Sequence, residues 1–209
     1  MRKIAIMGGS FDPVHIGHVS FVKDVLAQLP VDEAVFMPAK LQPFKLDEEP
    51  APFYDRKEML CLATKSEPFM SVSELENELQ GVSYTYRTLR EFKKMTGRDT
   101  KVYFLVGTDT FMQMDTWKES SDLLGNNSII VAHRPGYDRG RLYAKKSEYE
   151  KKFSTEILTI ENKKVDISST QIRERIKAGK SINNLVHKDV EIYIGEKGLY
   201  KSLQKKVIW

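Results

Sequence analysis

Residues 7–18 read Met-Gly-Gly-Ser-Phe-Asp-Pro-Val-His-Ile-Gly-His. An apolar run at 3–7 precedes this stretch and a run with helical spacing at 19–29 follows it, which predicts a turn from a strand into a helix. Gly8 and Gly9 stand directly after the strand, where the missing Cβ atoms let a ligand approach the backbone closely. We expect the rest of the chain to be organised around this turn.

The turn has the residue types of an anion site. Ser10 offers a hydroxyl, and Asp12 before Pro13 is held out of the α region and suits a turn. His15 and His18 fall where the helix begins, and the unpaired backbone N–H groups there carry partial positive charge. We therefore expect this turn to receive an anion.

Strand and helix signals alternate along the chain. Strand-like runs lie at 3–7, 34–38, 69–73, 101–107, 128–133 and 156–161. Helical patterns lie between most of them, at 19–29, 55–65, 84–95 and 141–153. The alternation predicts an α/β fold with a doubly wound parallel sheet. Its ligand site should lie beyond the carboxyl ends of the strands, where the first strand meets the turn.

Two consecutive helices are predicted after the last strand, at 168–178 and 188–194. Glycines that close helices are expected at Gly97, Gly179 and Gly195. The segment at 40–53, which is rich in proline, reads as a long loop near the site, and we interpret it as a substrate loop.

Size and composition narrow the class of protein. The 209 residues are 41% hydrophobic and 30% charged, which suits one domain over 1–209, with an α/β core at 1–165 and a helical C-terminal cap at 166–209. Because the sequence has no apolar run of membrane-spanning length and no signal peptide, we expect a cytoplasmic protein without a membrane partner. The net charge of +4 suits an anionic small molecule but shows no footprint of a nucleic-acid binder.

The two histidines of the turn allow three interpretations. His15 and His18 could hold a metal ion, but a metal site needs a third ligand, and His133 and His187 stand in other contexts. They could instead be structural. We favour a third role, in which the imidazoles donate hydrogen bonds to phosphate oxygens. The single cysteine, Cys61, rules out a multi-cysteine zinc site.

A second motif, Asp-Ile-Ser-Ser-Thr-Gln-Ile-Arg, occupies residues 166–173. Ser168, Ser169 and Thr170 supply hydroxyls and a helix N-cap, and a well-capped helix would explain them without a ligand. Arg173, however, lies one turn into that helix, where a cation gains nothing from the helix dipole unless an anion is bound.

Together the two motifs resemble the (H/T)xGH nucleotidyltransferase superfamily, with residues 167–173 similar to its ISSTxIR motif. Further segments closely resemble the bacterial nicotinate mononucleotide adenylyltransferases: Ser83-Tyr-Thr-Tyr-Arg-Thr-Leu89, Phe104-Leu-Val-Gly-Thr-Asp109, Trp117-Lys118 and Arg134-Pro-Gly136. The resemblance covers nearly the whole chain. It implies a Rossmann-like fold and the transfer of AMP from ATP to nicotinate mononucleotide, giving nicotinate adenine dinucleotide and pyrophosphate in NAD biosynthesis.

The resemblance also assigns roles to residues. The catalytic residues would be His15, His18 and Arg173. ATP would be bound by Gly8, Gly9, Ser10, Phe11, Gly107, Asp109, Arg134, Ile167, Ser168 and Thr170. The mononucleotide would be bound by Lys45, Ser83, Tyr84, Thr85 and Trp117. Mg²⁺ would be held mainly by phosphates and water rather than by protein ligands.

Some alternatives stay open. Asp109 could cap the following short helix, and Trp117 could belong to the core. The acceptor could be nicotinamide mononucleotide or another phosphate, and a non-catalytic nucleotide-binding protein could share the fold. The oligomeric state is also open, and a homo-oligomer is one outcome.

Three positions depart from expectation or add nothing to the site. Phe44 stands where the family often has histidine, so this position offers no polar contact to the mononucleotide, and His187 stands where proline is usual. Arg56, beside Lys57 and Glu58, is predicted to be a solvated surface charge on a helix and is left out of the site.

Overall fold

The computed structural model describes residues 1–42, 49–133, 136–162 and 167–201. Its centre is a six-stranded sheet in the order β3-β2-β1-β4-β5-β6. The strands are β1 (Arg2–Gly9), β2 (Glu33–Pro38), β3 (Met70–Val72), β4 (Thr100–Gly107), β5 (Ser128–His133) and β6 (Ile157–Glu161). Every neighbouring pair is parallel, which confirms the predicted doubly wound α/β fold.

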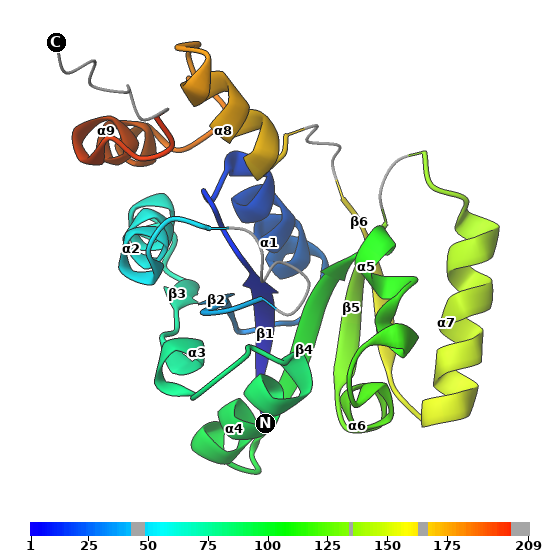
Figure 1. The fold of residues 1–209 in the computed structure, drawn as a ribbon. Coiled ribbons are helices and arrows are strands. Elements are labelled where there is room, and N and C mark those ends of the chain that lie inside the picture. The colour runs from blue at the N-terminus through cyan, green and yellow to red at the C-terminus, as the bar shows by residue number, and fades with distance from the viewer. Residues whose placement is uncertain (43–48, 134–135, 163–166, 202–209) are drawn as a thin grey trace, which may run out of the picture.

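Helices cover both faces of the sheet (Figure 1). The main helices are α1 (Ile16–Gln28), α2 (Phe53–Thr64), α4 (Thr85–Thr96), α7 (Arg139–Phe153), α8 (Ser169–Lys177) and α9 (Lys188–Lys197). Shorter ones are α3 (Leu75–Glu78), α5 (Thr108–Phe111), η1 (Met114–Thr116) and α6 (Ser120–Gly125). A short helix was expected beside Asp109, and α5 lies there. The other short helices were not predicted, because one or two turns carry too little periodicity to detect.

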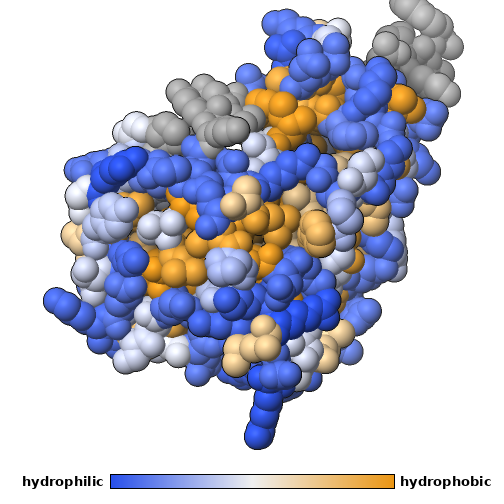
Figure 2. Space-filling model, turned by 180° about the vertical axis from the view of Figure 1, so that it is seen from behind, coloured by the Kyte–Doolittle hydropathy of each residue, from blue (hydrophilic) through white to orange (hydrophobic). Residues whose placement is uncertain are grey.

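The two faces have separate cores because side chains alternate along a strand. Ala5 packs in one buried cluster with residues of α1, α2 and α9. Ile4 and Ile6 pack in the other cluster with residues of α4, α6 and α7. Figure 2 shows the molecule from behind, with hydrophobic residues visible mostly in recesses between hydrophilic ones.

The strand order reverses at β1, which pairs with β2 on one side and β4 on the other. In a doubly wound sheet this reversal opens a crevice beyond the carboxyl ends of the two strands that diverge from it. The turn of residues 7–18 leaves β1 at that point. The topology therefore puts this turn, called the anion turn below because it is predicted to receive an anion, beside the crevice.

Of the three glycines predicted to end helices, two do so and one does not. Gly97 is the C-cap of α4 with φ of 77°, and Gly179 follows α8 with φ of 65°, as expected. The prediction for Gly195 was wrong, because α9 continues through it to Lys197 and ends at Gly198, which has φ of 65°. Two glycines lie close together, and the one that takes the left-handed conformation ends the helix.

The C-terminal helices lie over the carboxyl ends of the strands (Figure 1). Backbone and side-chain hydrogen bonds tie them down: the Ile16 N–H donates to the Leu185 carbonyl at 3.0 Å, and Tyr193 OH donates to Asp55 Oδ1 at 2.8 Å. The division at 165/166 falls among residues 163–166, outside the described residues, so it stays a prediction. In the described part of the chain, no helix has the length and apolar character needed to cross a membrane.

Candidate active site

Two adjoining cavities open at the carboxyl ends of β1 and β4. The α4-side cavity has a volume of about 320 Å³ and includes residues 83–86 at the start of α4. The α5-side cavity has a volume of about 540 Å³ and includes Gly107 and Asp109. The residues that line both are Gly8, Gln42, Phe104, Thr116 and Trp117. Both cavities lie where the reversal of strand order predicts a ligand site.

The glycines and Phe11 shape the turn that borders these cavities. A Cβ on Gly8 would lie 3.4 Å from Phe104 Cε2, and one on Gly9 would lie 3.2 Å from the Phe11 ring. Phe11 itself has φ of 49°, in the left-handed region that bulky residues rarely adopt. Its buried ring packs edge-on against His18, with ring centroids 5.1 Å apart. Aromatic packing therefore offsets the strain of a turn that exposes the backbone to the cavities.

His15 and His18 stack on each other at the start of α1. His15 is the N-cap residue, and its ring centroid lies 3.7 Å from that of His18. The backbone N–H of His15 donates to Nδ1 of His18 at 3.2 Å. Because Nδ1 accepts this bond, a neutral His18 carries its proton on Nε2, which then serves as a donor to a ligand.

Burial keeps both imidazoles uncharged in the free protein. It lowers the pKa of His15 to about 4. It also holds the pKa of His18 well below its usual value, with a smaller contribution from the neighbouring His15. At neutral pH the pair therefore offers neutral donors, and a phosphate bound beside it would raise both pKa values.

The second motif folds back onto this turn. Arg173 Nη1 donates to the Asp12 carbonyl at 2.7 Å, and Ser169 Oγ donates to the Pro13 carbonyl at 2.8 Å. Ser168 is the N-cap of α8, and its hydroxyl accepts from the Gln171 N–H at 3.1 Å. The well-capped helix is thus present, and Arg173 extends from it to the turn.

The remaining residues of this motif lie beside the same contacts. Arg173 Nη2 donates to Thr170 Oγ1 at 3.4 Å, and the half-buried Ile167 packs against the core cluster that includes Phe11. The structure therefore brings the two predicted halves of the ATP site together.

The prediction that Arg56 is solvated was wrong, because this side chain is only 2% exposed. Its Nη1 donates to the Ser10 carbonyl and its Nε donates to the Ala51 carbonyl, both at 2.8 Å. Asp12, also buried, accepts from the Ala51 N–H at 3.0 Å and from Tyr200 OH at 2.7 Å. Burial together with Asp12 raises the pKa of Tyr200. Arg56 and Asp12 thus fix the turn through buried hydrogen bonds.

No local signal distinguishes Arg56 from an exposed helical arginine, since its neighbours along α2 include Lys57 and Glu58. Its partners are remote in sequence: 46 positions separate it from Ser10. Sequence reasoning missed Arg56 for that reason.

The described residues predicted to bind the mononucleotide, Ser83, Tyr84, Thr85 and Trp117, line the α4-side cavity. Ser83 Oγ accepts from the backbone N–H of Lys40 at 3.1 Å, so it also fixes the segment after β2. Tyr84 is the N-cap of α4 and Thr85 its first residue, and both line the cavity, so the first turn of the helix borders it. The half-buried Trp117 packs edge-to-face with Phe104, with ring centroids 6.5 Å apart. Trp117 thus contacts the core and lines both cavities.

A buried carboxyl, that of Glu76, also lines this cavity. Glu76 is 7% exposed, and Thr88 Oγ1 donates to its Oε1 at 2.9 Å. Burial raises the pKa of Glu76. Glu76 was not among the predicted site residues, since an acidic run such as residues 74–78 reads as a solvated surface.

The predicted adenosine contacts are described only in part. Gly107 is the N-cap of α5 and Asp109 lies in its first turn, and both line the α5-side cavity. Gly107 has no side chain with which to cap α5, and the capping role of Asp109 stays an alternative to ribose binding. Arg134 and Lys45, as well as Phe44, lie outside the described residues.

Within the described ranges, no group of three or more His, Cys, Asp and Glu side chains could hold a metal ion. The two remaining histidines make local contacts: His133 Nε2 lies 3.2 Å from the Tyr137 carbonyl oxygen, and His187 Nδ1 accepts from the Asp189 N–H at 3.3 Å. Neither belongs to the anion turn.

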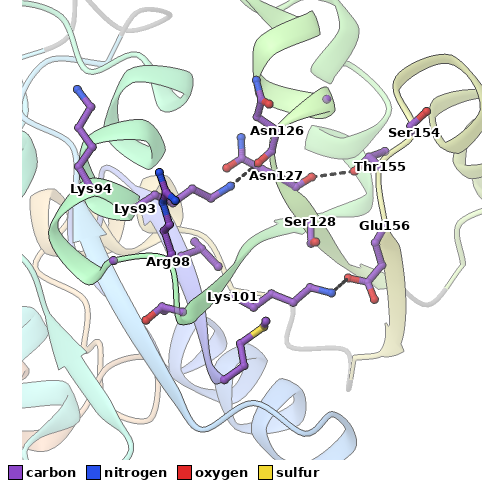
Figure 3. A pocket seen from close by; sticks show the side chains of 15 residues that line it. Lys93, Lys94, Arg98, Lys101, Asn126, Asn127, Ser128, Ser154, Thr155 and Glu156 are labelled. Carbon is purple, nitrogen blue, oxygen red and sulfur yellow. Dashed lines mark hydrogen bonds and ion pairs between the residues drawn. The ribbon is translucent and has the colours of Figure 1, made fainter.

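A separate hollow of about 810 Å³ lies at the opposite, amino end of the sheet (Figure 3). Figure 3 shows Lys93 and Arg98 entering from one side, with Lys101 reaching across to Glu156. The main charged groups have partners, since Lys93 donates to the Asn126 carbonyl and Lys101 pairs with Glu156 at 2.6 Å. These contacts give Lys93 and Lys101 structural roles in joining neighbouring elements.

Comparisons with known proteins agree with this site. Residues 6–175 match the Cytidylyltransferase-like family. A probable nicotinate-nucleotide adenylyltransferase of Thermoanaerobacter sp. (strain X514) is 36% identical over 200 residues, which cover 96% of this chain and 95% of the relative. A protein of the same name from Clostridium novyi (strain NT) is 35% identical over 201 residues, with 96% and 100% covered.

Among solved structures, the nicotinic acid mononucleotide adenylyltransferase of Plasmodium falciparum, complexed with NaAD, has the same fold. Its TM-score is 0.78 at 22% identity, and the match covers 96% of this chain and 98% of that one. The chain therefore belongs to the Cytidylyltransferase-like family and, within it, to the nicotinate-nucleotide adenylyltransferases, the nucleotidyltransferases of NAD biosynthesis.

Proposed function

We propose that this chain transfers AMP from ATP to nicotinate mononucleotide, with the triphosphate bound between the turn of residues 7–18 and α8. The observation that carries the proposal is the contact of Arg173 with the turn, where Nη1 lies 2.7 Å from the Asp12 carbonyl oxygen. This contact puts a guanidinium and two imidazole-bearing residues around one helix N-terminus. Such an arrangement suits an extended anion such as a triphosphate.

The reaction needs positioning and charge stabilisation more than acid–base chemistry. A 5′-phosphate oxygen of the mononucleotide attacks the α-phosphorus of ATP, and the bond from that phosphorus to the bridging oxygen breaks to release pyrophosphate. The attacking phosphate is already anionic, so no side chain has to remove a proton. We assign His18 Nε2–H and His15 to donors that stabilise charge moving onto the pyrophosphate.

Arg173 holds the outer phosphates from the opposite side in this proposal. Because the guanidinium already contacts Asp12 and Thr170, it is preorganised near the turn and needs little reordering when ATP binds. Ser10, Ser168 and the N–H groups near Gly9 and Phe11 would add neutral donors. Asp109 would accept from the ribose of ATP, supported by its place in the α5-side cavity.

The α4-side cavity would hold nicotinate mononucleotide. The N–H groups of Thr85 and its neighbours at the start of α4 suit the carboxylate of nicotinate, because a helix N-terminus attracts negative charge. The indole of Trp117 offers a face for the pyridine ring, and Ser83 and Tyr84 complete the wall. Lys45 and Arg134 keep the roles predicted for them.

The adenylyl transfer proposed for this chain involves a metal ion together with ATP, and we propose Mg²⁺. The residues fit an ion that arrives on the phosphates. The groups around the turn are imidazoles, a guanidinium and backbone N–H donors, and the Asp12 carboxylate already accepts from Tyr200 and Ala51. Mg²⁺ carried by ATP would neutralise phosphate charge, with water filling its other coordination positions. Location in the cytoplasm stays a prediction, and the oligomeric state stays open.

The test is a substrate panel with the purified chain. With ATP, Mg²⁺ and nicotinate mononucleotide we expect pyrophosphate and nicotinate adenine dinucleotide, and a folded preparation that forms neither would contradict the proposal. Replacing the acid by nicotinamide mononucleotide should lower kcat/KM by about tenfold or more, since the amide brings no charge to the N-terminus of α4. A higher value for the amide would favour the amide-preferring alternative, and equal values would show that the site does not distinguish the two.

A further inference from the structure

We infer that Gln42 is a further substrate-binding residue, whose side-chain Nε2 donates hydrogen bonds to phosphate oxygens where the two substrates meet. The inference rests on the proposed assignment of the two cavities. It concerns a residue just after β2, in the segment that leads from the sheet toward α2.

The position of Gln42 is the first argument. Residues that line both cavities lie where the two proposed substrates would meet, and Gln42 is one of them. Of the others, Gly8 and Phe104 have no polar side chain, and Trp117 is assigned to the pyridine ring. The hydroxyl of Thr116 donates to the Gln113 carbonyl at 2.8 Å, so its proton is not available for a bond to a ligand. Gln42 is therefore the shared residue whose polar side chain can best serve a ligand.

The orientation of the carboxamide is the second argument. Ser10 Oγ donates to Gln42 Oε1 at 2.5 Å. A primary amide is planar, so when Oε1 is fixed by Ser10, both N–H groups of Nε2 are directed elsewhere. Among the described residues, Nε2 has no hydrogen-bond partner. A ligand phosphate would supply acceptors for them.

The rigidity of the support is the third argument. Ser10 is itself held, because its carbonyl accepts from the buried Arg56 at 2.8 Å. Ser10 is thus held by the buried Arg56 through its backbone carbonyl, and it holds Gln42 through its side-chain hydroxyl. A donor held in this way costs little entropy to position, and a neutral amide stabilises charge as it develops without competing for protons.

The experiment compares Gln42→Ala and Gln42→Glu in steady-state assays of pyrophosphate release. Gln42→Ala should lower kcat/KM by roughly tenfold to a hundredfold, the effect of losing one hydrogen bond to a charged group. Gln42→Glu keeps an oxygen that accepts from Ser10, so a merely structural anchor would survive it. Because it removes the donor and adds a negative charge, we expect a loss larger than that of Gln42→Ala.

Ser10→Ala tests the coupling. If Ser10 acts through the orientation of Gln42, the double variant should lose less than the product of the single losses, whereas independent roles would multiply. The matched control is Gln80→Ala, an exposed glutamine outside the shared lining, which should stay within about twofold.

Wild-type levels of kcat/KM in Gln42→Glu would overturn the inference while leaving the proposed function intact. An inactive wild-type chain would instead overturn the proposed function, so the two failures are distinguishable. Thermal melting of each variant confirms that the compared preparations are folded.

Discussion

Arg173 Nη1 lies 2.7 Å from the backbone oxygen of Asp12 and 3.7 Å from its carboxylate. The same carboxylate accepts from Tyr200 and from the N–H of Ala51. One buried residue therefore joins the anion turn, the start of α2 and the C-terminal helices. Changes near Asp12 should affect stability and activity together, whereas changes at His18 or Trp117 should affect activity more than stability.

His18→Ala should lower kcat by about a hundredfold or more, because the variant loses a preorganised donor to the leaving group. Steady-state pyrophosphate release measures the effect. His187→Asn is the control: His187 caps α9 away from the turn, asparagine is also a good N-cap, and kcat should stay close to that of the wild type. A His18→Ala enzyme with normal kcat would return His18 to a structural role.

Stability should fall as the pH drops from about 6.5 toward 4. The folded protein resists protonation of His15, whose pKa is about 4, while the unfolded chain takes up the proton near the ordinary value of 6.5. The stabilisation is fully present above the unfolded pKa and is lost between the two values, by on the order of 3 kcal/mol for complete titration.

Urea denaturation at pH 7.0, 5.5 and 4.5, compared between wild type and His15→Gln, measures this loss. The glutamine variant should lose less stability over the same range, since position 15 no longer titrates. Parallel curves for the two proteins would show that His15 does not carry the effect.

Arg56→Met should destabilise the fold by about 3 kcal/mol or more, because the Ser10 and Ala51 carbonyls lose their donor and buried Asp12 loses a nearby positive charge. The free energy of unfolding, from chemical denaturation, gives the value. Arg141→Met removes an exposed arginine of α7 and should change stability by less than about 0.5 kcal/mol. Similar small effects in both variants would argue against an anchoring role for Arg56.

Trp117→Ala should raise KM for nicotinate mononucleotide by about tenfold through the loss of ring stacking, and Trp117→Phe should recover part of it. The same assays with ATP as the varied substrate should show the smaller change. Phe69→Ala, at an aromatic residue that is 62% exposed, provides the control. If Trp117→Ala raised only the KM for ATP, the pyridine would have to lie elsewhere.

Much of the fold was predictable because it depends on local patterns. Six strands and the main helices follow from period-2 and period-3.6 hydrophobic spacing, with boundaries that move by a few residues. The parallel sheet follows from their alternation, and the candidate site follows from the glycines that end β1 and the histidines after it. Gly195 shows where local reasoning fails, since two neighbouring glycines could each end α9.

By itself, the sequence determined the turn of residues 7–18 between a strand and a helix, and the residue types there that suit phosphate. Only the tertiary structure decided which distant groups meet there. Asp12 and Arg173 are 161 positions apart, and Ser10 and Gln42 are 32 apart. Arg56 became a buried anchor for the same reason, because burial depends on what packs around a side chain and not on its neighbours along the chain.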